Sequence, residues 1–293
     1  MPCICVLSAQ IQADGFSVRK KIAMYEELYS PLPDADAYLE RIGLAGESPE
    51  PTAEWLDRLI HAQLTHIPFD AMDCWGKGVT PSLAIDDLFD KIVRRHRGGY
   101  CFELNSLFCS FLRALGYEAY VVIIHLLRDF TPPPAHCAVI CVIGGEKYFC
   151  DVGYGGPVPD GCVRYDGKVH HGYRVIPEGD FFCLELVNDD GSSRRVMLYS
   201  DNAVLPVDLI PLNFYVSGRP DSGFCRVLNV NFRLEDGSVW ISGRKFFLHT
   251  SSERIEREIE DLDDLRGILE GYFGIPWQEV TARPLDDQPG FST

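Results

Sequence analysis

The segment RGGYCFELN, residues 97–105, joins a glycine turn to the start of a helix. Gly98 and Gly99 let the backbone turn sharply. The stripe that follows has helical spacing and ends at a glycine: Leu104, Leu107, Phe108, Phe111, Leu112, Leu115 and then Gly116. Cys101 therefore opens a helix, where the helix dipole and free backbone N–H groups favour the nucleophilic thiolate. The same position also suits a buried, inert cysteine, and this alternative stays open here.

Helical patterns also precede this segment, from residue 34 onward. Asp34 or Asp36 is expected to cap a short helix through Tyr38–Ile42. Pro51-Thr52 opens the next helix and Pro68 stops it. Its apolar face consists of Leu56, Leu59, Ile60 and Leu64. A third helix is indicated by the i, i+3, i+4, i+7 spacing of Ile85, Leu88, Phe89 and Ile92.

After residue 118 the pattern changes to strands. The predicted strands are Ala119–Leu127, His136–Ile143, Glu146–Val152, Val169–Ile176, Phe181–Val187, Arg194–Tyr199, Arg226–Leu234 and Val239–Leu248. Gly144-Gly145 and Asp236-Gly237 are expected to form hairpin turns, and residues 213–224 are expected to form a loop. A final helix carries Leu262, Leu265, Ile268, Leu269 and Tyr272. Helices followed by strands and then a mixed tail predict an α+β protein.

The hairpin at Gly144-Gly145 is expected to bring a histidine close to an aspartate. If these glycines form the loop, Ala138 lies opposite Asp151. His136 is two residues from Ala138 on the same face, so His136 and Asp151 become diagonal neighbours. Their surroundings are apolar, and an unpaired buried polar group costs roughly 2–7 kcal/mol. They therefore form either a structural pair or an imidazole that a carboxylate orients.

A cysteine, a histidine and an aspartate together suggest a ping-pong reaction. His136 takes the thiol proton, Asp151 holds the imidazole, and the sulfur of Cys101 carries an acyl group between donor and acceptor. The phosphate-binding, zinc-protease and serine-hydrolase motifs GxxxxGK[ST], HExxH and GxSxG are absent from the sequence. Gly153-Tyr154-Gly155-Gly156 is predicted to be a loop, and His170-His171 a solvated strand edge.

The composition is that of a soluble globular protein, with 46% hydrophobic and 24% charged residues. Twenty-seven basic and 43 acidic residues give a net charge of −16, which disfavours a nucleic acid partner. We find no signal peptide pattern, and no stretch reaches the roughly 18 apolar residues of a membrane span. We therefore predict a cytoplasmic protein that contacts neither membrane nor nucleic acid.

The 11 cysteines do not follow a disulfide-framework spacing. Several lie in apolar strand patterns, where free cysteine behaves as a small hydrophobe, so a reducing compartment is expected. Cys3 and Cys5 lack a second pair at zinc-ligand spacing, and no metal is predicted.

Several segments resemble those of the arylamine N-acetyltransferases. The nine-residue segment at 97–105 resembles the nucleophile motif of that family, and HCAVIC at His136 and YFCDVGYG at Asp151 fit as well. Further similar segments are YLERIGL, PTAEWLDRLIHAQLTHIPF, DKIVRRHRGG, NFYVSGRPDSGF and the final YFGI. The resemblance runs from about Tyr38 to Ile275, which is most of the chain.

The resemblance implies an N-terminal helical bundle, a central antiparallel β-barrel and a C-terminal α/β lid, with a papain-like Cys-His-Asp triad. We predict the corresponding boundaries at residues 1–117, 118–210 and 211–293. It also implies acetyl transfer from acetyl-CoA to arylamines, arylhydrazines or arylhydroxylamines through a thioester on Cys101. We expect a monomer or a homodimer.

The same resemblance assigns further contacts. Tyr215 and Ser222 match loop positions that touch coenzyme A in relatives, and Phe69 and Phe102 are expected to line the aromatic acceptor pocket. The chain has Pro68-Phe69-Asp70-Ala71 where relatives commonly read PFEN, which leaves the acceptor preference open. The long insertion of some animal members is absent, which favours a microbial-type enzyme with a more open coenzyme A cleft.

Other functions use the same residues. A related acyltransferase would take malonyl or propionyl donors, or close a macrocycle as an amide synthase. A papain-like or transglutaminase-like enzyme would act on peptide amides and ignore acyl-CoA. A binding module or redox sensor would show no selective reactivity at Cys101.

Overall fold

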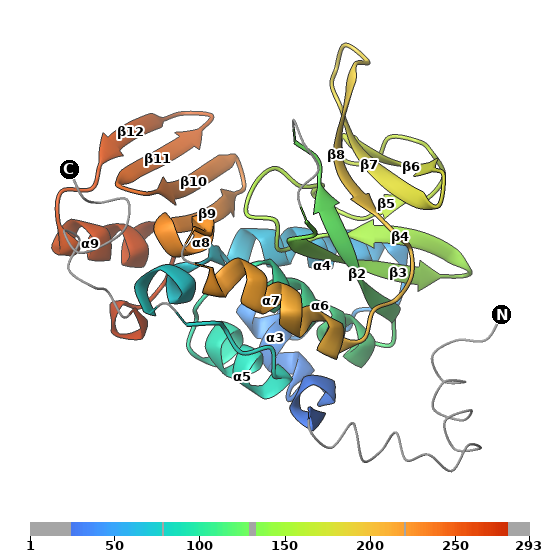
Figure 1. Cartoon of the computed structure of the whole chain (residues 1–293), viewed down its shortest axis with the longest axis horizontal. Coiled ribbons are helices and arrows are strands. Elements are labelled where there is room, and N and C mark those ends of the chain that lie inside the picture. Colours follow the sequence, from blue (N-terminus) through green and yellow to red (C-terminus); the bar gives the residue numbers. More distant parts are fainter. Residues whose placement is uncertain (1–24, 78, 129–132, 220, 281–293) are drawn as a thin grey trace.

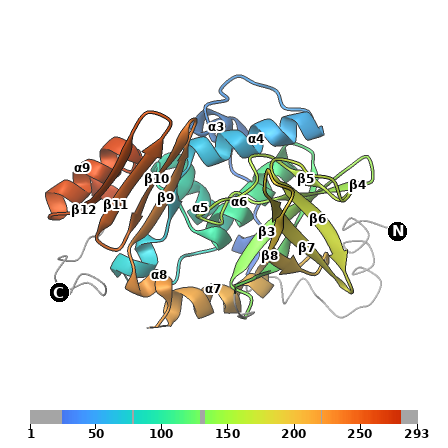
Figure 2. The same cartoon turned by 90° about the horizontal axis from the view of Figure 1, so that it is seen from above.

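The computed structural model describes residues 25–280, except residues 78, 129–132 and 220. A central group of helices lies between a seven-stranded sheet and a five-stranded sheet (Figures 1 and 2). This arrangement confirms the α+β class. The boundaries at 1–117, 118–210 and 211–293 stay a prediction.

The N-terminal helices follow the predicted caps and stops. Their bounds are η1 Glu26–Tyr29, α3 Ala35–Arg41, α4 Ala53–His66, the π-helix η2 Asp73–Lys77, α5 Ile85–Phe89 and the π-helix η3 Asp90–Arg94. The side chains of Asp34 and Thr52 accept hydrogen bonds from the backbone of the first turn, as N-caps do. The third predicted helix is therefore α5 with a π-helical continuation.

Helix α6, Cys101–Ala114, is the centre of the largest apolar core. Its predicted stripe is buried, from Leu104 to Leu112. The helix ends where expected, because Gly116 has a left-handed φ of +89°. At the other end Glu103 accepts the backbone N–H of Tyr100 at 3.0 Å, one half of a capping box.

The seven-stranded sheet is antiparallel, nearly closes into a barrel and runs in the order β5-β4-β3-β2-β8-β7-β6. Its strands are β2 Glu118–Leu126, β3 His136–Ile143, β4 Glu146–Cys150, β5 Val163–Arg164, β6 Tyr173–Glu178, β7 Phe181–Val187 and β8 Ser193–Tyr199. The predicted hairpin register is confirmed, since Ile143 pairs with Glu146 and Val139 with Cys150. The strand predicted at Val169–Ile176 begins only at Tyr173, because His171 and Gly172 have positive φ and form a turn.

The C-terminal sheet has the order β1-β9-β10-β11-β12. Its strands are β1 Phe69–Asp70, β9 Asn229–Leu234, β10 Gly237–Ser242, β11 Lys245–Thr250 and β12 Arg254–Glu258, and helix α9, Leu262–Tyr272, packs on it (Figure 2). The short helix η5 Trp277–Glu279 follows. The strand predicted at Val239–Leu248 is divided into β10 and β11, because Gly243 turns with a φ of +59°.

The loop predicted at residues 213–224 is wrong. After η4, Pro206–Asp208, the chain forms α7, Leu209–Gly218, and α8, Gly223–Arg226. Helix α7 buries the polar residues Asn213 and Ser217 and exposes Phe214, so it lacks the one-sided apolar stripe from which amphipathic helices are predicted. Asn213 is buried and donates to the carbonyl of Pro81 at 2.8 Å, which fixes α7 to the loop before α5.

Gly98 is required where the glycine turn meets the end of the α4 segment. A Cβ on Gly98 would overlap the carbonyl oxygen of Pro68 and lie 2.8 Å from the Cβ of Asp70. We expect Gly98→Ala to lower the free energy of unfolding by about 1–3 kcal/mol, the usual cost of overpacking.

Urea denaturation measures this change, and Gly267→Ala is the matched control. Gly267 lies in α9 with no atom within 4 Å of an added Cβ, so alanine should be neutral or stabilise by up to about 1 kcal/mol. Equal midpoints for Gly98→Ala and wild type would contradict the expectation.

Candidate active site

Cys101 is the first residue of α6 and is 3% exposed. The turn before it is held by the sheet, because the Gly99 carbonyl accepts the N–H of Asp70 at 2.9 Å. The Sγ of Cys101 lies 3.8 Å from the carbonyl oxygen of Ala135, the residue before His136. The thiol therefore lies beside the start of β3.

His136 begins β3, and Asp151 directly follows β4. The Nε2 of His136 lies 2.7 Å from Oδ2 of Asp151, and both side chains are almost completely buried. Burial by itself lowers the pKa of His136. The charge and hydrogen bond of Asp151, with a hydrogen bond and charge from Cys101, more than offset this and raise it to about 10. The three side chains are thus adjacent.

Asn105 is a residue of this site that the sequence analysis quoted but gave no role. Its Nδ2 donates to Oδ1 of Asp151 at 3.0 Å and to the carbonyl of Cys137 at 2.7 Å. Its Oδ1 accepts the N–H of Val152 at 3.1 Å. Because Asn105 is four residues after Cys101 on the same helix face, one helix carries both the thiol and the amide that orients the aspartate. That spacing was the signal available in the sequence.

The loop after Asp151 closes against the same helix. The N–H of Gly153 donates to Oδ1 of Asp151 at 2.9 Å. A Cβ at Gly153 would lie 2.8 Å from Nδ2 of Asn105 and 3.0 Å from Cα of Cys101, so the close contact requires glycine. The ring of Tyr154 packs edge-on against His136, with centroids 5.5 Å apart. The predicted loop is therefore part of the wall of the site.

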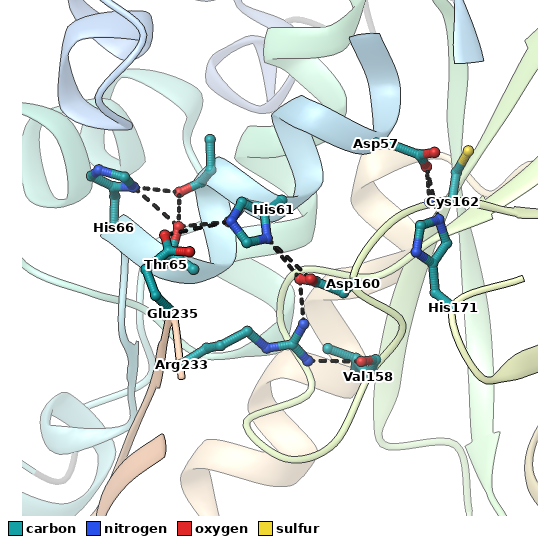
Figure 3. Close-up of polar contacts among 11 residues, drawn as sticks. Asp57, His61, Thr65, His66, Val158, Asp160, Cys162, His171, Arg233 and Glu235 are labelled. Atoms are coloured by element: carbon teal, nitrogen blue, oxygen red, sulfur yellow. Dashed lines mark hydrogen bonds and ion pairs between the residues drawn. The ribbon is translucent and has the colours of Figure 1, made fainter. Parts of the chain in front are cut away.

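The far end of this loop, at Val158 and Asp160, contacts side chains of α4 and β9 (Figure 3). The Oδ2 of Asp160 lies 3.0 Å from Nδ1 of His61, and Arg233 reaches both Asp160 and the carbonyl of Val158. Nearby, Asp57 accepts the N–H of Cys162 at 2.7 Å. Partly exposed ion pairs contribute little each, but together these contacts place the loop between two elements remote in sequence.

The predicted acceptor-pocket residues lie near the thiol. Phe69 forms a parallel bridge with Gly99, and a Cβ on Gly155 would lie 2.6 Å from its ring, so Phe69 lies between the two loops of the site. Phe102 is completely buried, with its ring 5.7 Å from that of Tyr100.

Of the two residues predicted to contact coenzyme A, one lies in helix α7 and the other caps helix α8. Tyr215 is on α7, with the guanidinium of Arg219 4.4 Å from its ring centroid. Ser222 is the N-cap of α8, donates to the carbonyl of Val216 and accepts the N–H of Phe224 at 3.3 Å. Their predicted contacts with coenzyme A stay a prediction.

Among the residues that the structure describes, no group of three or more His, Cys, Asp or Glu side chains is arranged to hold a metal ion. His170 pairs with Asp166 at 2.9 Å and His171 with Asp57 at 3.3 Å. Cys3 and Cys5 lie outside the described residues. Over the same described residues, no helix is both long and apolar enough to span a bilayer.

Comparisons with known proteins set the class. A family model described as N-acetyltransferase matches residues 52–281. The arylamine N-acetyltransferase of Mycolicibacterium smegmatis is 29% identical, over 86% of this chain and 95% of its own length. The human arylamine N-acetyltransferase 1 is 22% identical, over 84% and 95%.

The structure of the Mycobacterium marinum arylamine N-acetyltransferase superposes with a TM-score of 0.76 at 28% identity, covering 84% of this chain and 94% of that one. The enzyme of M. tuberculosis gives a TM-score of 0.78 at 26% identity, covering 89% and 100%. This chain belongs to the arylamine N-acetyltransferase family, and the family consists of acyltransferases.

The His136–Asp151 pair predicts a pH-dependent stability. The pKa of His136 is about 10 in the folded protein, above the roughly 6.5 of an unfolded histidine. In Cys101→Ala, where no thiol can give its proton to the imidazole, the folded state therefore holds an extra proton between these values. Its stabilisation is complete below pH 6.5 and is lost as the pH rises through the folded pKa, at about 1.4 kcal/mol per pH unit. Urea denaturation across this range should show that slope in Cys101→Ala and its absence in Cys101→Ala with His136→Gln; parallel profiles would contradict it.

Asn105 predicts a loss of stability when its amide is removed. Asn105→Ala leaves the Cys137 carbonyl and the Val152 N–H buried without this partner, so we expect destabilisation by about 1–3 kcal/mol. Urea denaturation measures it. Asn202→Ala, on the exposed surface, is the control and should stay within about 0.5 kcal/mol of wild type. A loss for Asn105→Ala no larger than that of the control would refute the role.

Proposed function

We propose that this protein transfers the acetyl group of acetyl-CoA to the nitrogen of arylamines, arylhydrazines or arylhydroxylamines, through a thioester on Cys101. The observation that carries the proposal is the thiol at the start of α6, 3.8 Å from the carbonyl oxygen of Ala135, directly before a histidine whose Nε2 is 2.7 Å from a buried carboxylate. The family and a solved relative described in complex with CoA support the donor.

In the first half-reaction the proton of Cys101 resides on His136, whose raised pKa keeps it an imidazolium beside Asp151, and the sulfur is a thiolate. The thiolate attacks the acetyl carbonyl, a C–S bond to Cys101 forms, and the C–S bond to coenzyme A breaks. The departing thiolate of coenzyme A receives the proton from His136. The products are the acetyl-enzyme and free coenzyme A.

In the second half-reaction the acceptor nitrogen attacks the acetyl-thioester. A C–N bond forms, the bond to Sγ breaks, and His136 takes the proton of the amine and returns it to the sulfur. Because Nε2 faces Asp151, the ring presents Nδ1 to Cys101 in both halves. The aspartate therefore selects the tautomer that the reaction needs.

The acceptor site in this proposal lies between the loops of Gly99 and Gly155, where Phe69 is placed, with Phe102 as a second wall. Tyr215 and Ser222, on α7 and α8, are proposed to contact coenzyme A. The protein is proposed to act in the cytoplasm on aromatic amines or hydrazines, including xenobiotic ones, as a monomer or a homodimer. No metal takes part in the proposed steps.

The proposal predicts that acetyl-CoA adds one acetyl group to the wild-type protein. Cys101→Ala should gain none, and His136→Gln should load about 10²–10⁴-fold more slowly, the usual contribution of a general base. Intact-protein mass spectrometry against time measures both. Cys225→Ala, which removes a partly exposed cysteine, is the matched control and should load as wild type does.

Loading of Cys101→Ala at the wild-type rate would overturn the proposal. A separate screen compares malonyl-CoA and propionyl-CoA with acetyl-CoA, using one fixed arylamine. Faster turnover with either donor than with acetyl-CoA would indicate a related acyltransferase instead. Cleavage of peptide amides without any acyl-CoA turnover would favour a papain-like hydrolase.

A further inference from the structure

Behind Cys101, the capping residue of the nucleophile helix is paired with a buried lysine. Glu103, the third residue of α6, has a side chain only 2% exposed. One carboxylate oxygen accepts the N–H of Tyr100 at 3.0 Å, and the other accepts from Nζ of Lys91 at 2.7 Å. The carboxylate therefore joins the residue that directly precedes Cys101 to an ammonium on η3.

Lys91 is itself buried, with a side chain 8% exposed. Its Nζ also lies 2.7 Å from Oδ2 of Asp73, so it bridges two carboxylates. Beyond Asp73 the alternation of charge continues, because Arg97 lies 3.5 Å from Asp73 and 2.7 Å from Asp70. These five residues form a continuous charged chain beneath the glycine turn that carries Cys101.

The electrostatics of this chain depend on Lys91. Burial raises the pKa of Glu103, and the charge and hydrogen bond of Lys91 oppose that rise. Burial lowers the pKa of Lys91, but Glu103, Asp70 and Asp73 more than offset it, so the pKa is raised and the side chain stays an ammonium. Removing one partner of a buried pair leaves an uncompensated charge and is costly.

We propose that Lys91 and Glu103 are positioning residues for the Cys101 nucleophile. Glu103 fixes the first turn of α6 through the N–H of Tyr100. Lys91 holds that carboxylate and neutralises it, so that no uncompensated negative charge stands two residues from the thiolate. The proposal deepens the proposed function and rests on Cys101 being its nucleophile.

The pair can be reached from solvent. A cavity of about 260 Å³ is lined by Lys91 and Glu103 together with Asp73, Ser82 and Asp87. A small alkylammonium ion that enters this cavity can therefore replace a truncated lysine side chain. This gives the proposal a test by chemical rescue.

The test uses the rate at which iodoacetamide alkylates Cys101 at pH 7, followed by peptide mass mapping. This readout needs no acyl donor. Lys91→Met leaves the Glu103 carboxylate without its ammonium partner. We expect alkylation of Cys101 to slow about tenfold or more, because the uncompensated negative charge opposes thiolate formation. Glu103→Gln keeps an acceptor for Tyr100 and leaves Lys91 with Asp73, so its rate should stay within about threefold of wild type.

The decisive variant is the double substitution Lys91→Met with Glu103→Gln. It should recover to about the rate of Glu103→Gln, because the two substitutions remove one charge of each sign and Asp73 still has Arg97 at 3.5 Å. A lysine with a merely structural role would give a double variant as slow as Lys91→Met or slower, and that result would overturn the proposal. Arg94→Met, on the exposed side of η3, is the matched control and should alkylate as wild type does.

Chemical rescue supplies a second measurement. In Lys91→Ala, added propylammonium should raise the alkylation rate saturably, whereas tetramethylammonium, which has no N–H, should not.

Circular dichroism shows whether Lys91→Met and Lys91→Ala fold. If they do not, the double variant is the deciding measurement. It must fold and alkylate at about the rate of Glu103→Gln, and failure of either overturns the proposal. Acetyl-CoA loading of wild type is measured in parallel. Its absence, with the alkylation pattern intact, removes the proposed function and leaves the positioning role.

Discussion

A charge that is buried must keep an opposite partner, and this constraint organises the centre of the protein. His136 keeps its raised pKa because Asp151 lies 2.7 Å away, and Asp151 is held in turn by Asn105. On the other side of the nucleophile helix, Lys91 compensates Glu103. Helix α6 therefore lies between two buried ion pairs, and its first residue is the thiol.

The second constraint is close approach of the backbone. The turn before Cys101 contacts the end of the α4 segment at Gly98, and the loop after Asp151 contacts Cys101 and Asn105 at Gly153. A larger residue at Gly98 would push the segment of Pro68 and Asp70 away from the turn, and a larger residue at Gly153 would push the loop after β4 away from α6. The glycines thus set the distance over which a thiol on one element and an imidazole on another can share a proton.

Each part of the fold supplies a different component of the site. The helical part supplies the sulfur, the barrel supplies the imidazole and its carboxylate, and β9 secures the loop that walls the site through Arg233 and Asp160. Because β1 joins the C-terminal sheet directly beside Gly99, that sheet is continuous with the nucleophile turn. The helices, the barrel and the C-terminal sheet therefore all contact the site around Cys101.

The sequence alone determined the features that rest on local patterns. Helix caps, the stripe of α6, the two-glycine hairpin and its register are short-range, so His136 and Asp151 could be paired before the structure was known. Cys101 was added to the pair through the resemblance of its motif. Helix α7 was not predicted because its buried face carries polar Asn213 and Ser217 while Phe214 is exposed. Strand β1 was not predicted because a strand of two residues shows no periodic pattern. The four-residue spacing places Asn105 on the helix face of Cys101, but the roles of Asn105 and Lys91 were decided by tertiary structure, because their hydrogen-bond and charge partners come from other segments of the chain.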